Sequence, residues 1–286
     1  MKIGISTYAY AWAIGVPSAM PDHPMDVYRF VEAVAANGVD LVQIADNLPL
    51  HVLSDSELVA LKDHLKQFSM SVEIGIRGLT DALMERYLDL AAYFQSPILR
   101  VVTDLCDYKP TTAEIVDVLR RWVPVAKVNN ITIALENHDR FKVSELIQIV
   151  RQFDISEVGI CLDTVNSLGA LECPDVVIQG LSPYTVNIHL KDFRIFRPNY
   201  SMGFIVEGTV AGKGMLDFKS IFKNPLLIQH NPNIILELWT PFGPTIADTV
   251  AKEAEWVEKS IKNLRRYDLS LGKSTYGLKK DELSVK

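Results

Sequence analysis

Cysteine is scarce in this chain: Cys106, Cys161 and Cys173 are the three in 286 residues, and none has the CxxC spacing. This pattern argues against a disulfide scaffold and against a metal site built from thiolates. Because disulfides are rare in reducing compartments, so few scattered thiols favour a cytoplasmic protein.

An excess of positive charge is also lacking, since 29 Lys and Arg face 35 Asp and Glu, for a formal net charge of −6. No Lys/Arg run stands out, so we expect no nucleic-acid partner. No apolar run is long enough to cross a bilayer, so no membrane partner is expected either.

The N-terminus allows two interpretations. Lys2 followed by the mostly apolar stretch 3–19 resembles a signal peptide. The alternative is a buried first strand at Ile3–Ser6. We favour the strand, because its removal would leave the repeat described next one strand short.

Short apolar runs, rich in Val, Ile and Leu, recur from the start of the chain almost to its end. They are continuous rather than alternating, which is typical of parallel strands covered on both faces. The predicted strands are Ile3–Ser6, Leu41–Ala45, Val72–Ile76, Leu99–Thr103, Thr132–Leu135, Val158–Leu162, Val186–Leu190 and Ile234–Leu238.

Helical patterns separate these runs. The predicted helices are Val27–Asn37, Ser54–Phe68, Thr80–Phe94, Thr112–Asn129, Ser144–Gln152, Pro174–Gly180, Asp217–Phe222 and Ala247–Tyr267. Pro124 predicts a kink or break within the fourth. No GxGxxG follows the first strand, which disfavours an open doubly wound sheet. The fold class is therefore α/β, a single (β/α)8 TIM barrel over residues 1–268, with a polar tail at 269–286.

Ionisable residues stand at the ends of four consecutive predicted strands: Glu136, Asp163, His189 and Glu237. In such a barrel, reactive groups gather at the C-terminal ends of the strands. Three converging carboxylates repel one another unless a cation neutralises them. Three oxygens and an imidazole suit one divalent ion, Mn2+, Mg2+, Co2+ or Zn2+, rather than copper.

These strand ends, together with Gly212–Phe218, resemble the xylose isomerase-like TIM barrel superfamily, which contains sugar phosphate isomerases and epimerases, dehydratases and endonuclease IV. The resemblance implies that Glu136, Asp163, His189 and Glu237 bind the metal, Mn2+ being favoured. It further implies that Glu136 and Glu237 are the catalytic pair, as in the ketose epimerases. Many members have a histidine where this chain has Asn166. With six histidines in all, the chain has too few for the several zinc sites of endonuclease IV.

Other residues near the predicted barrel mouth are candidates for binding a carbohydrate substrate. Lys191 suits a substrate oxygen, arginines suit a carboxylate or phosphate, and tryptophans suit stacking on a sugar. Each also has an ordinary structural interpretation. The long segment 193–210 is predicted to fold over the site as a lid. The substrate-binding candidates are His138, Asn166, Lys191, Arg194, Arg197, Trp12 and Trp239, with Arg140 and Tyr8 nearby.

Three functions follow from this pattern. The leading hypothesis is a metal-dependent isomerase or epimerase of a keto-sugar, acting through a stabilised enediolate. The alternative is a metal-dependent lyase, a decarboxylase or dehydratase, acting on an inosose or an oxidised sugar acid. The stretches 136–140, 191–193 and 202–204 are similar to members such as the 3-oxo-isoapionate decarboxylases. A second alternative is a non-catalytic sugar-binding barrel. Related barrels often pair, so a homodimer is expected by analogy.

Overall fold

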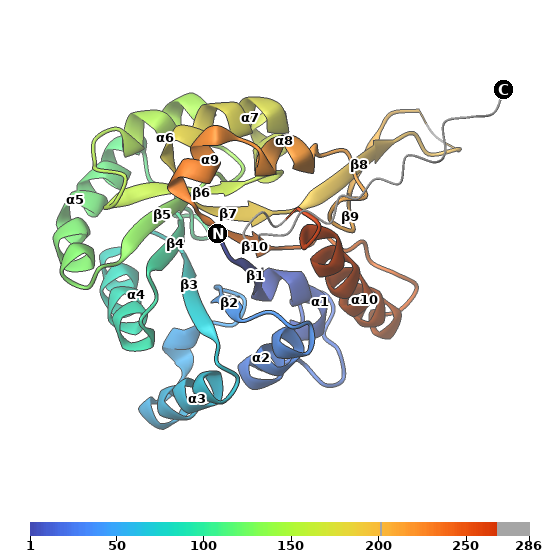
Figure 1. Cartoon of the computed structure of the whole chain (residues 1–286), viewed down its shortest axis with the longest axis horizontal. Helices are drawn as coiled ribbons and strands as arrows, with labels where there is room; N and C mark the ends of the chain where they lie inside the picture. Colours follow the sequence, from blue (N-terminus) through green and yellow to red (C-terminus); the bar gives the residue numbers. More distant parts are fainter. Residues whose placement is uncertain (201, 268–286) are drawn as a thin grey trace, which may run out of the picture.

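The chain folds as a closed parallel barrel surrounded by helices (Figure 1). The computed structural model describes residues 1–200 and 202–267. Within them, eight strands pair in the order β1-β10-β7-β6-β5-β4-β3-β2, all parallel. This is the predicted (β/α)8 barrel. The barrel strands are β1 Ile3–Ser6, β2 Leu41–Ile44, β3 Ser71–Arg77, β4 Ile98–Val102, β5 Thr132–Glu136, β6 Val158–Asp163, β7 Thr185–Leu190 and β10 Asn233–Leu236.

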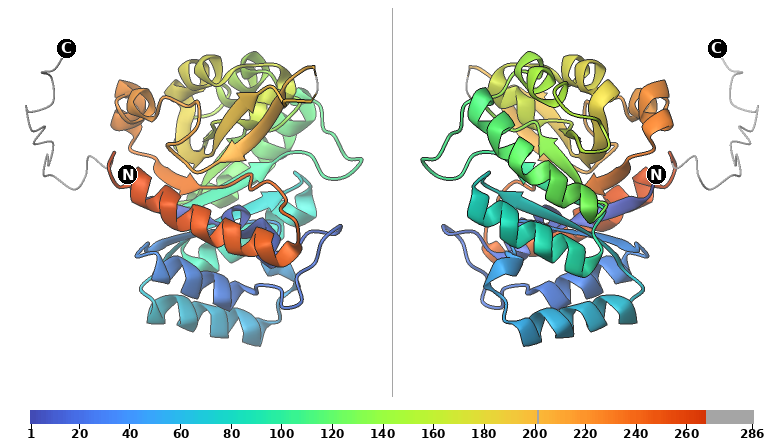
Figure 2. Two further views of the ribbon diagram at one scale, coloured as in Figure 1. Left: turned by 90° about the vertical axis from the view of Figure 1, so that its right-hand side faces the viewer. Right: turned by 90° about the vertical axis from the view of Figure 1, so that its left-hand side faces the viewer.

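The helices form the outer layer, seen from two sides in Figure 2. Many begin with a side-chain cap that satisfies a free backbone N–H; Ser54 and Thr111, for example, each open a capping box. The helices are α1 Ala11–Ile14, α2 Val27–Ala36, α3 Asp55–Gln67, α4 Asp81–Phe94, α5 Thr112–Val128, α6 Val143–Val150, α7 Pro174–Leu181, α8 Phe218–Phe222, α9 Pro225–His230 and α10 Ile246–Leu264.

Of the kink or break predicted at Pro124, the break is wrong, because α5 runs through it without interruption. Pro124 lies on the exposed side of the helix. There the carbonyl of Arg120, which loses its hydrogen-bond donor to the proline, can turn to water.

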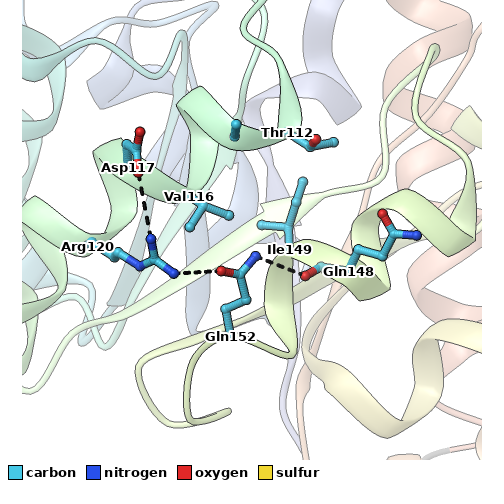
Figure 3. Close-up of a pocket in the computed structure, with 8 residues that line it drawn as sticks. Thr112, Val116, Asp117, Arg120, Gln148, Ile149 and Gln152 are labelled. Atoms are coloured by element: carbon cyan, nitrogen blue, oxygen red, sulfur yellow. Dashed lines mark hydrogen bonds and ion pairs between the residues drawn. The ribbon is translucent and has the colours of Figure 1, made fainter.

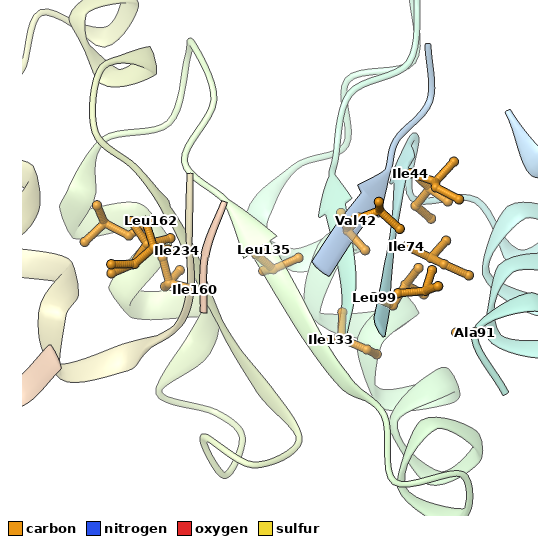
Figure 4. Packing of buried hydrophobic residues seen from close by; sticks show 14 of the residues in the cluster. Val42, Ile44, Ile74, Ala91, Leu99, Ile133, Leu135, Ile160, Leu162 and Ile234 are labelled. Atoms are coloured by element: carbon orange, nitrogen blue, oxygen red, sulfur yellow. The ribbon is translucent and has the colours of Figure 1, made fainter. Parts of the chain in front are cut away.

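Apolar strand residues pack both inside the barrel and against the helices, as the continuous apolar pattern predicts. Ile74, Leu99 and Leu135 are fully buried, and Figure 4 shows them among their neighbours. The interior is not wholly apolar. Gln43, Glu73 and others place fully buried polar side chains among the strands. The barrel therefore has an apolar outer face and a partly polar centre.

The segment predicted as a lid, 193–210, belongs to an antiparallel hairpin that was not predicted. Its strands are β8 Asp192–Phe196 and β9 Ile205–Thr209, paired from Asp192 with Thr209 to Phe196 with Ile205. In Figure 1 the hairpin extends away from the barrel. The short helix α9 was also not predicted.

The first strand is confirmed, since β1 pairs with both β10 and β2 and so closes the barrel. Among the described residues, no helix combines the length and hydrophobicity needed to cross a bilayer. The polar tail predicted at 269–286 lies outside the described residues.

Candidate metal centre and barrel mouth

The four predicted metal ligands converge at one end of the barrel. Glu136 and Asp163 are the last residues of β5 and β6, His189 lies in β7, and Glu237 directly follows β10. Each is at most 3% exposed. The imidazole Nδ1 of His189 lies 3.3 Å from Glu136 Oε2 and 3.3 Å from Glu237 Oε1.

Three of the atoms that meet in this cluster are suited to bind a metal ion. Glu136 Oε2, His189 Nδ1 and Glu237 Oε1 are buried and make no well-aligned hydrogen bond, although Arg100 Nε forms an ion pair with Glu136 Oε2. A buried polar atom without a partner costs free energy unless something else satisfies it. A divalent cation would satisfy all three, and their mixed oxygen and nitrogen chemistry suits one. The donor set therefore fits a metal ion.

Asp163 completes the set. Ligand atoms from Asp163, His189 and Glu237 all lie within 4.8 Å of one another. Asp163 Oδ1 accepts hydrogen bonds of 2.8 Å from the backbone N–H groups of Val165 and Asn166, which fixes the carboxylate. Burial raises the pKa of Asp163, although Lys191 opposes the rise.

Two protein cations also lie among these carboxylates. Arg100 Nε is 2.6 Å from Glu136 Oε2, and Lys191 Nζ is 2.6 Å from Asp163 Oδ2 and 2.8 Å from Glu237 Oε2. The prediction that only a metal could neutralise the carboxylates was therefore incomplete. Lys191 was predicted as a substrate-binding residue, whereas Arg100, in the middle of β4, was missed.

The cations set the ionisation of the site. Burial alone would raise the pKa of Glu136, but Arg100 and His189 lower it well below its usual value. Burial also opposes ionisation of Glu237, yet His189 and Lys191 lower its pKa. Burial disfavours the Lys191 ammonium, but Asp163 and Glu237 raise its pKa above the usual value. Both glutamates are anionic and Lys191 is cationic at neutral pH.

Asn166 connects two side chains of the cluster, Glu136 and Lys191. Its Nδ2 donates to Glu136 Oε1 at 2.7 Å, and its Oδ1 accepts from Lys191 Nζ at 3.2 Å. Asn166 is buried. It therefore holds two site residues, and its predicted role in substrate binding stays a prediction.

A second polar group lies at the ends of β2 and β3. Asp46 receives Arg100 Nη1 at 2.9 Å, Arg77 Nε at 3.3 Å and the Tyr8 hydroxyl at 2.8 Å. Arg77 Nη2 also donates to His138 Nε2 at 3.1 Å. The Arg77 side chain remains 31% exposed. Asp46 and Arg77 were missed, although the strand-end rule that found the metal ligands would have found both.

The predicted loop arginines contact groups other than the ligand cluster. Arg140 forms a two-point ion pair with Asp104, with distances of 2.8 Å from Nε and Nη2. Arg194 pairs with Glu207, its cross-strand partner in the hairpin. The guanidinium of Arg197 lies 4.2 Å from the ring centre of Phe204.

The two tryptophans that were predicted to bind substrate lie beside the site, near the end of strand β10. Trp12 donates from Nε1 to the carbonyl of Thr240 at 2.7 Å and packs on Phe242, with ring centres 5.2 Å apart. Lys191 Nζ lies 5.7 Å from the centre of the Trp239 ring, which is 38% exposed. Trp239 is thus near the ligand cluster and open to solvent.

A surface pocket between α5 and α6 offers no comparable chemistry. Figure 3 shows Arg120 held between Asp117 and Gln152, with Arg120 Nη2 2.7 Å from Gln152 Oε1. The remaining lining is largely apolar or neutral. The strand ends are therefore the candidate site.

The comparisons with known proteins agree with this architecture. Residues 31–267 match the family described as the xylose isomerase-like TIM barrel, and the chain belongs to that family. It is 31% identical over 264 residues to a 3-oxo-isoapionate decarboxylase of Pectobacterium atrosepticum, covering 92% of this chain and 95% of that protein.

Solved structures of the same fold are more distant in sequence. A D-psicose 3-epimerase crystallised with D-fructose is 18% identical, with a TM-score of 0.69, covering 96% of this chain and all of that one. A xylose isomerase-like barrel from Mycobacterium smegmatis in complex with magnesium is 15% identical, with a TM-score of 0.65. The match covers 92% of this chain and 97% of that one. At these identities the likeness shows the fold.

Proposed function

We propose that this chain is a divalent-metal-dependent lyase that decarboxylates a 3-oxo sugar acid. The relative at 31% identity, matched over 95% of its length, is a 3-oxo-isoapionate decarboxylase. The epimerases are below 20% identity and bear on the fold alone. This order reverses the one expected from sequence, where an isomerase or epimerase led.

The observation that carries the proposal is the environment of Glu136. Epimerisation needs two carboxylates that exchange protons with opposite faces of a substrate. Here Arg100 lies against one oxygen of Glu136 and Asn166 donates to the other. Both partners stabilise the anion, so Glu136 is a weak base. Decarboxylation needs no base at this position.

A decarboxylase must also hold the acid group of its substrate. Arg77 is the arginine of the mouth network with a substantially exposed side chain, since Arg100 is only 2% exposed. A guanidinium binds a carboxylate through two parallel N–H groups. His138, whose Nε2 accepts from Arg77 Nη2, fixes the orientation of that guanidinium.

The proposed reaction is the loss of CO2 from a β-keto acid. The bond between the carboxylate carbon and C2 breaks, and its electron pair forms an enolate across C2 and C3. When bound, a divalent cation supplies positive charge that stabilises the developing oxyanion. Glu136, Asp163, His189 and Glu237 would hold that ion. The Lys191 ammonium donates a proton to C2 and regains it from solvent.

An isomerase or epimerase of a keto-sugar is the second candidate. It is favoured by the placement of Glu136 Oε2 and Glu237 Oε1 at equal distances of 3.3 Å from His189 Nδ1. Two carboxylates flanking one centre are what a proton-shuttling pair requires.

The test follows a 3-oxo sugar acid labelled with 13C at its carboxylate, with Mn2+-loaded protein in D2O. Release of labelled CO2 and one deuteron at C2 is the expected result. Deuterium exchange in keto-sugars without loss of carbon would instead establish the isomerase. No turnover of either class, with no metal in elemental analysis, would leave the non-catalytic barrel.

A further inference from the structure

A chain of buried polar side chains lies inside the barrel beneath the ligand cluster. Gln43 of β2, Glu73 of β3 and Asn187 of β7 are fully buried, and Asn233 of β10 is partly buried. Polar groups in a barrel interior cost free energy unless they are hydrogen-bonded. None of them belongs to the proposed reaction, so their presence requires another explanation.

The three amide side chains of this network all donate to Glu73. Asn233 Nδ2 lies 2.8 Å from Glu73 Oε1, while Asn187 Nδ2 and Gln43 Nε2 lie 2.8 and 3.2 Å from Oε2. Gln43 Nε2 also donates to Asn187 Oδ1 at 3.2 Å. Glu73 is thus the common acceptor, and it determines which atom donates in each hydrogen bond of the network.

This pattern of donors and acceptors orients the Gln43 amide. Its Nε2 is committed to Glu73 and Asn187, so its Oε1 faces His189 Nε2 at a distance of 2.6 Å. A flipped amide would set Oε1 against Glu73 Oε2 and Asn187 Oδ1, which are both acceptors here. His189 Nε2 must therefore be the donor to Gln43.

We propose that Gln43, held by Glu73 and Asn187, fixes His189 as the Nε2–H tautomer and so leaves the Nδ1 lone pair directed at the ligand cluster. Gln43 is a positioning residue, and the inference rests on the proposed function only in assigning that lone pair to a metal. Metal-binding histidines commonly have their second ring nitrogen held in this way.

The positioning matters because two nearby carboxylates would stabilise the opposite tautomer, which has its proton on Nδ1. Glu136 Oε2 and Glu237 Oε1 each lie 3.3 Å from His189 Nδ1. Without an acceptor at Nε2, a proton on Nδ1 would bind these carboxylates and occupy the ligand position. Gln43 opposes that arrangement from the other side of the ring.

Although burial disfavours the imidazolium, Glu237 and Glu136 raise the pKa of His189. The first test therefore reads the tautomer in metal-free protein at alkaline pH, where the ring is neutral. Imidazole 15N spectra distinguish Nε2–H from Nδ1–H, and the signal that disappears in His189→Gln identifies His189. We expect Nε2–H in the wild type and a gain of Nδ1–H in Gln43→Leu. Nδ1–H in the wild type, or an unchanged tautomer in Gln43→Leu, would overturn the inference.

The second test measures Mn2+ affinity by competition with a chelator. Gln43→Leu is expected to weaken binding by roughly 10–100-fold. Glu73→Gln, which replaces the common acceptor without touching His189, should weaken it to a smaller extent. Glu253→Gln is the matched control, because it makes the same change at a buried glutamate of α10 that has no bond to the network.

The outcomes separate this inference from the proposed function. A wild type with Nε2–H but no Mn2+ binding would remove the metal site and leave the tautomer assignment standing. Normal Mn2+ binding in both Gln43→Leu and Glu73→Gln would remove the positioning role alone. If Gln43→Leu does not fold, Glu73→Gln carries both measurements.

Discussion

Arg100 and Glu136 form an ion pair inside the barrel, with Nε 2.6 Å from Oε2 and both side chains at most 2% exposed. The same guanidinium also contacts Asp46. One buried cation on β4 therefore joins the ligand cluster to the network at the mouth. Buried pairs of this kind do little for stability when intact but are costly to break.

Arg100→Met should destabilise the metal-free protein by about 3 kcal/mol or more, because it leaves the buried Glu136 without its arginine partner and Asp46 with Arg77 alone. Urea unfolding measures the effect. Arg120→Met, which removes an exposed partner of Asp117, is the control and should cost about 1 kcal/mol or less. Equal losses in the two variants would contradict the importance of the buried pair.

Arg77→Gln should raise KM for a 3-oxo sugar acid by roughly 10–100-fold and change kcat less, because a charge-assisted contact with the carboxylate is lost. Steady-state kinetics on the acid give both constants. Arg121→Gln, which affects an exposed pair with Asp81, should leave them unchanged. A normal KM for Arg77→Gln would place the substrate carboxylate elsewhere.

Lys191→Met should strengthen Mn2+ binding by about tenfold or more while lowering kcat by roughly 100-fold or more. The ammonium lies within 2.8 Å of two ligand carboxylates and competes with the ion, yet it is also the proposed proton donor. Metal titration and kinetics report the two effects separately. Lys66→Met, at an exposed pair with Asp63, is the control; weaker metal binding in Lys191→Met would refute the competition.

Glu253 should make stability fall as pH rises. It accepts backbone N–H groups from Trp12 and Ala13, and burial raises its pKa from 4.5 to about 8. Between these values the folded state keeps a proton that the unfolded state releases, so the free energy of unfolding decreases across this window and levels off above it. At about 1.4 kcal/mol per pKa unit, the contribution is a few kcal/mol.

Glu253→Gln imitates the protonated form and should show a shallower decline between pH 5 and 8 (roughly the window set by those two pKa values). Denaturant unfolding at several pH values measures it. Glu258→Gln, at an exposed glutamate of the same helix, should keep the wild-type slope. Parallel curves for all three proteins would assign the pH dependence to other groups.

Much of this architecture follows from local sequence signals. Continuous apolar runs such as 158–162 report strands buried on both faces, and helices between them imply parallel pairing. The C-terminal ends of the strands then meet at one rim of the barrel. For this reason the sequence predicts that Glu136 and His189 lie close together. Their distances of a few ångströms in the structure follow from the barrel register.

The polar residues within strands could not be placed in this way. Arg100 and Gln43 each interrupt an apolar run, and their sequence positions do not reveal which face they occupy. Their partners, Glu136 and His189, come from strands far along the chain. The hairpin was missed for a different reason, because β8 and β9 fall mostly within the segment 193–210, for which a lid but no strands were predicted.

The polar centre of the barrel limits how this site can be transplanted. Moving the four strand ends onto a barrel with a hydrocarbon interior would carry over the ligands but not the network from Asn233 through Glu73 to Gln43. The imidazole would then be free to protonate on its ligand nitrogen. A designer reusing this scaffold must treat the inside of β2, β3 and β7 as part of the site.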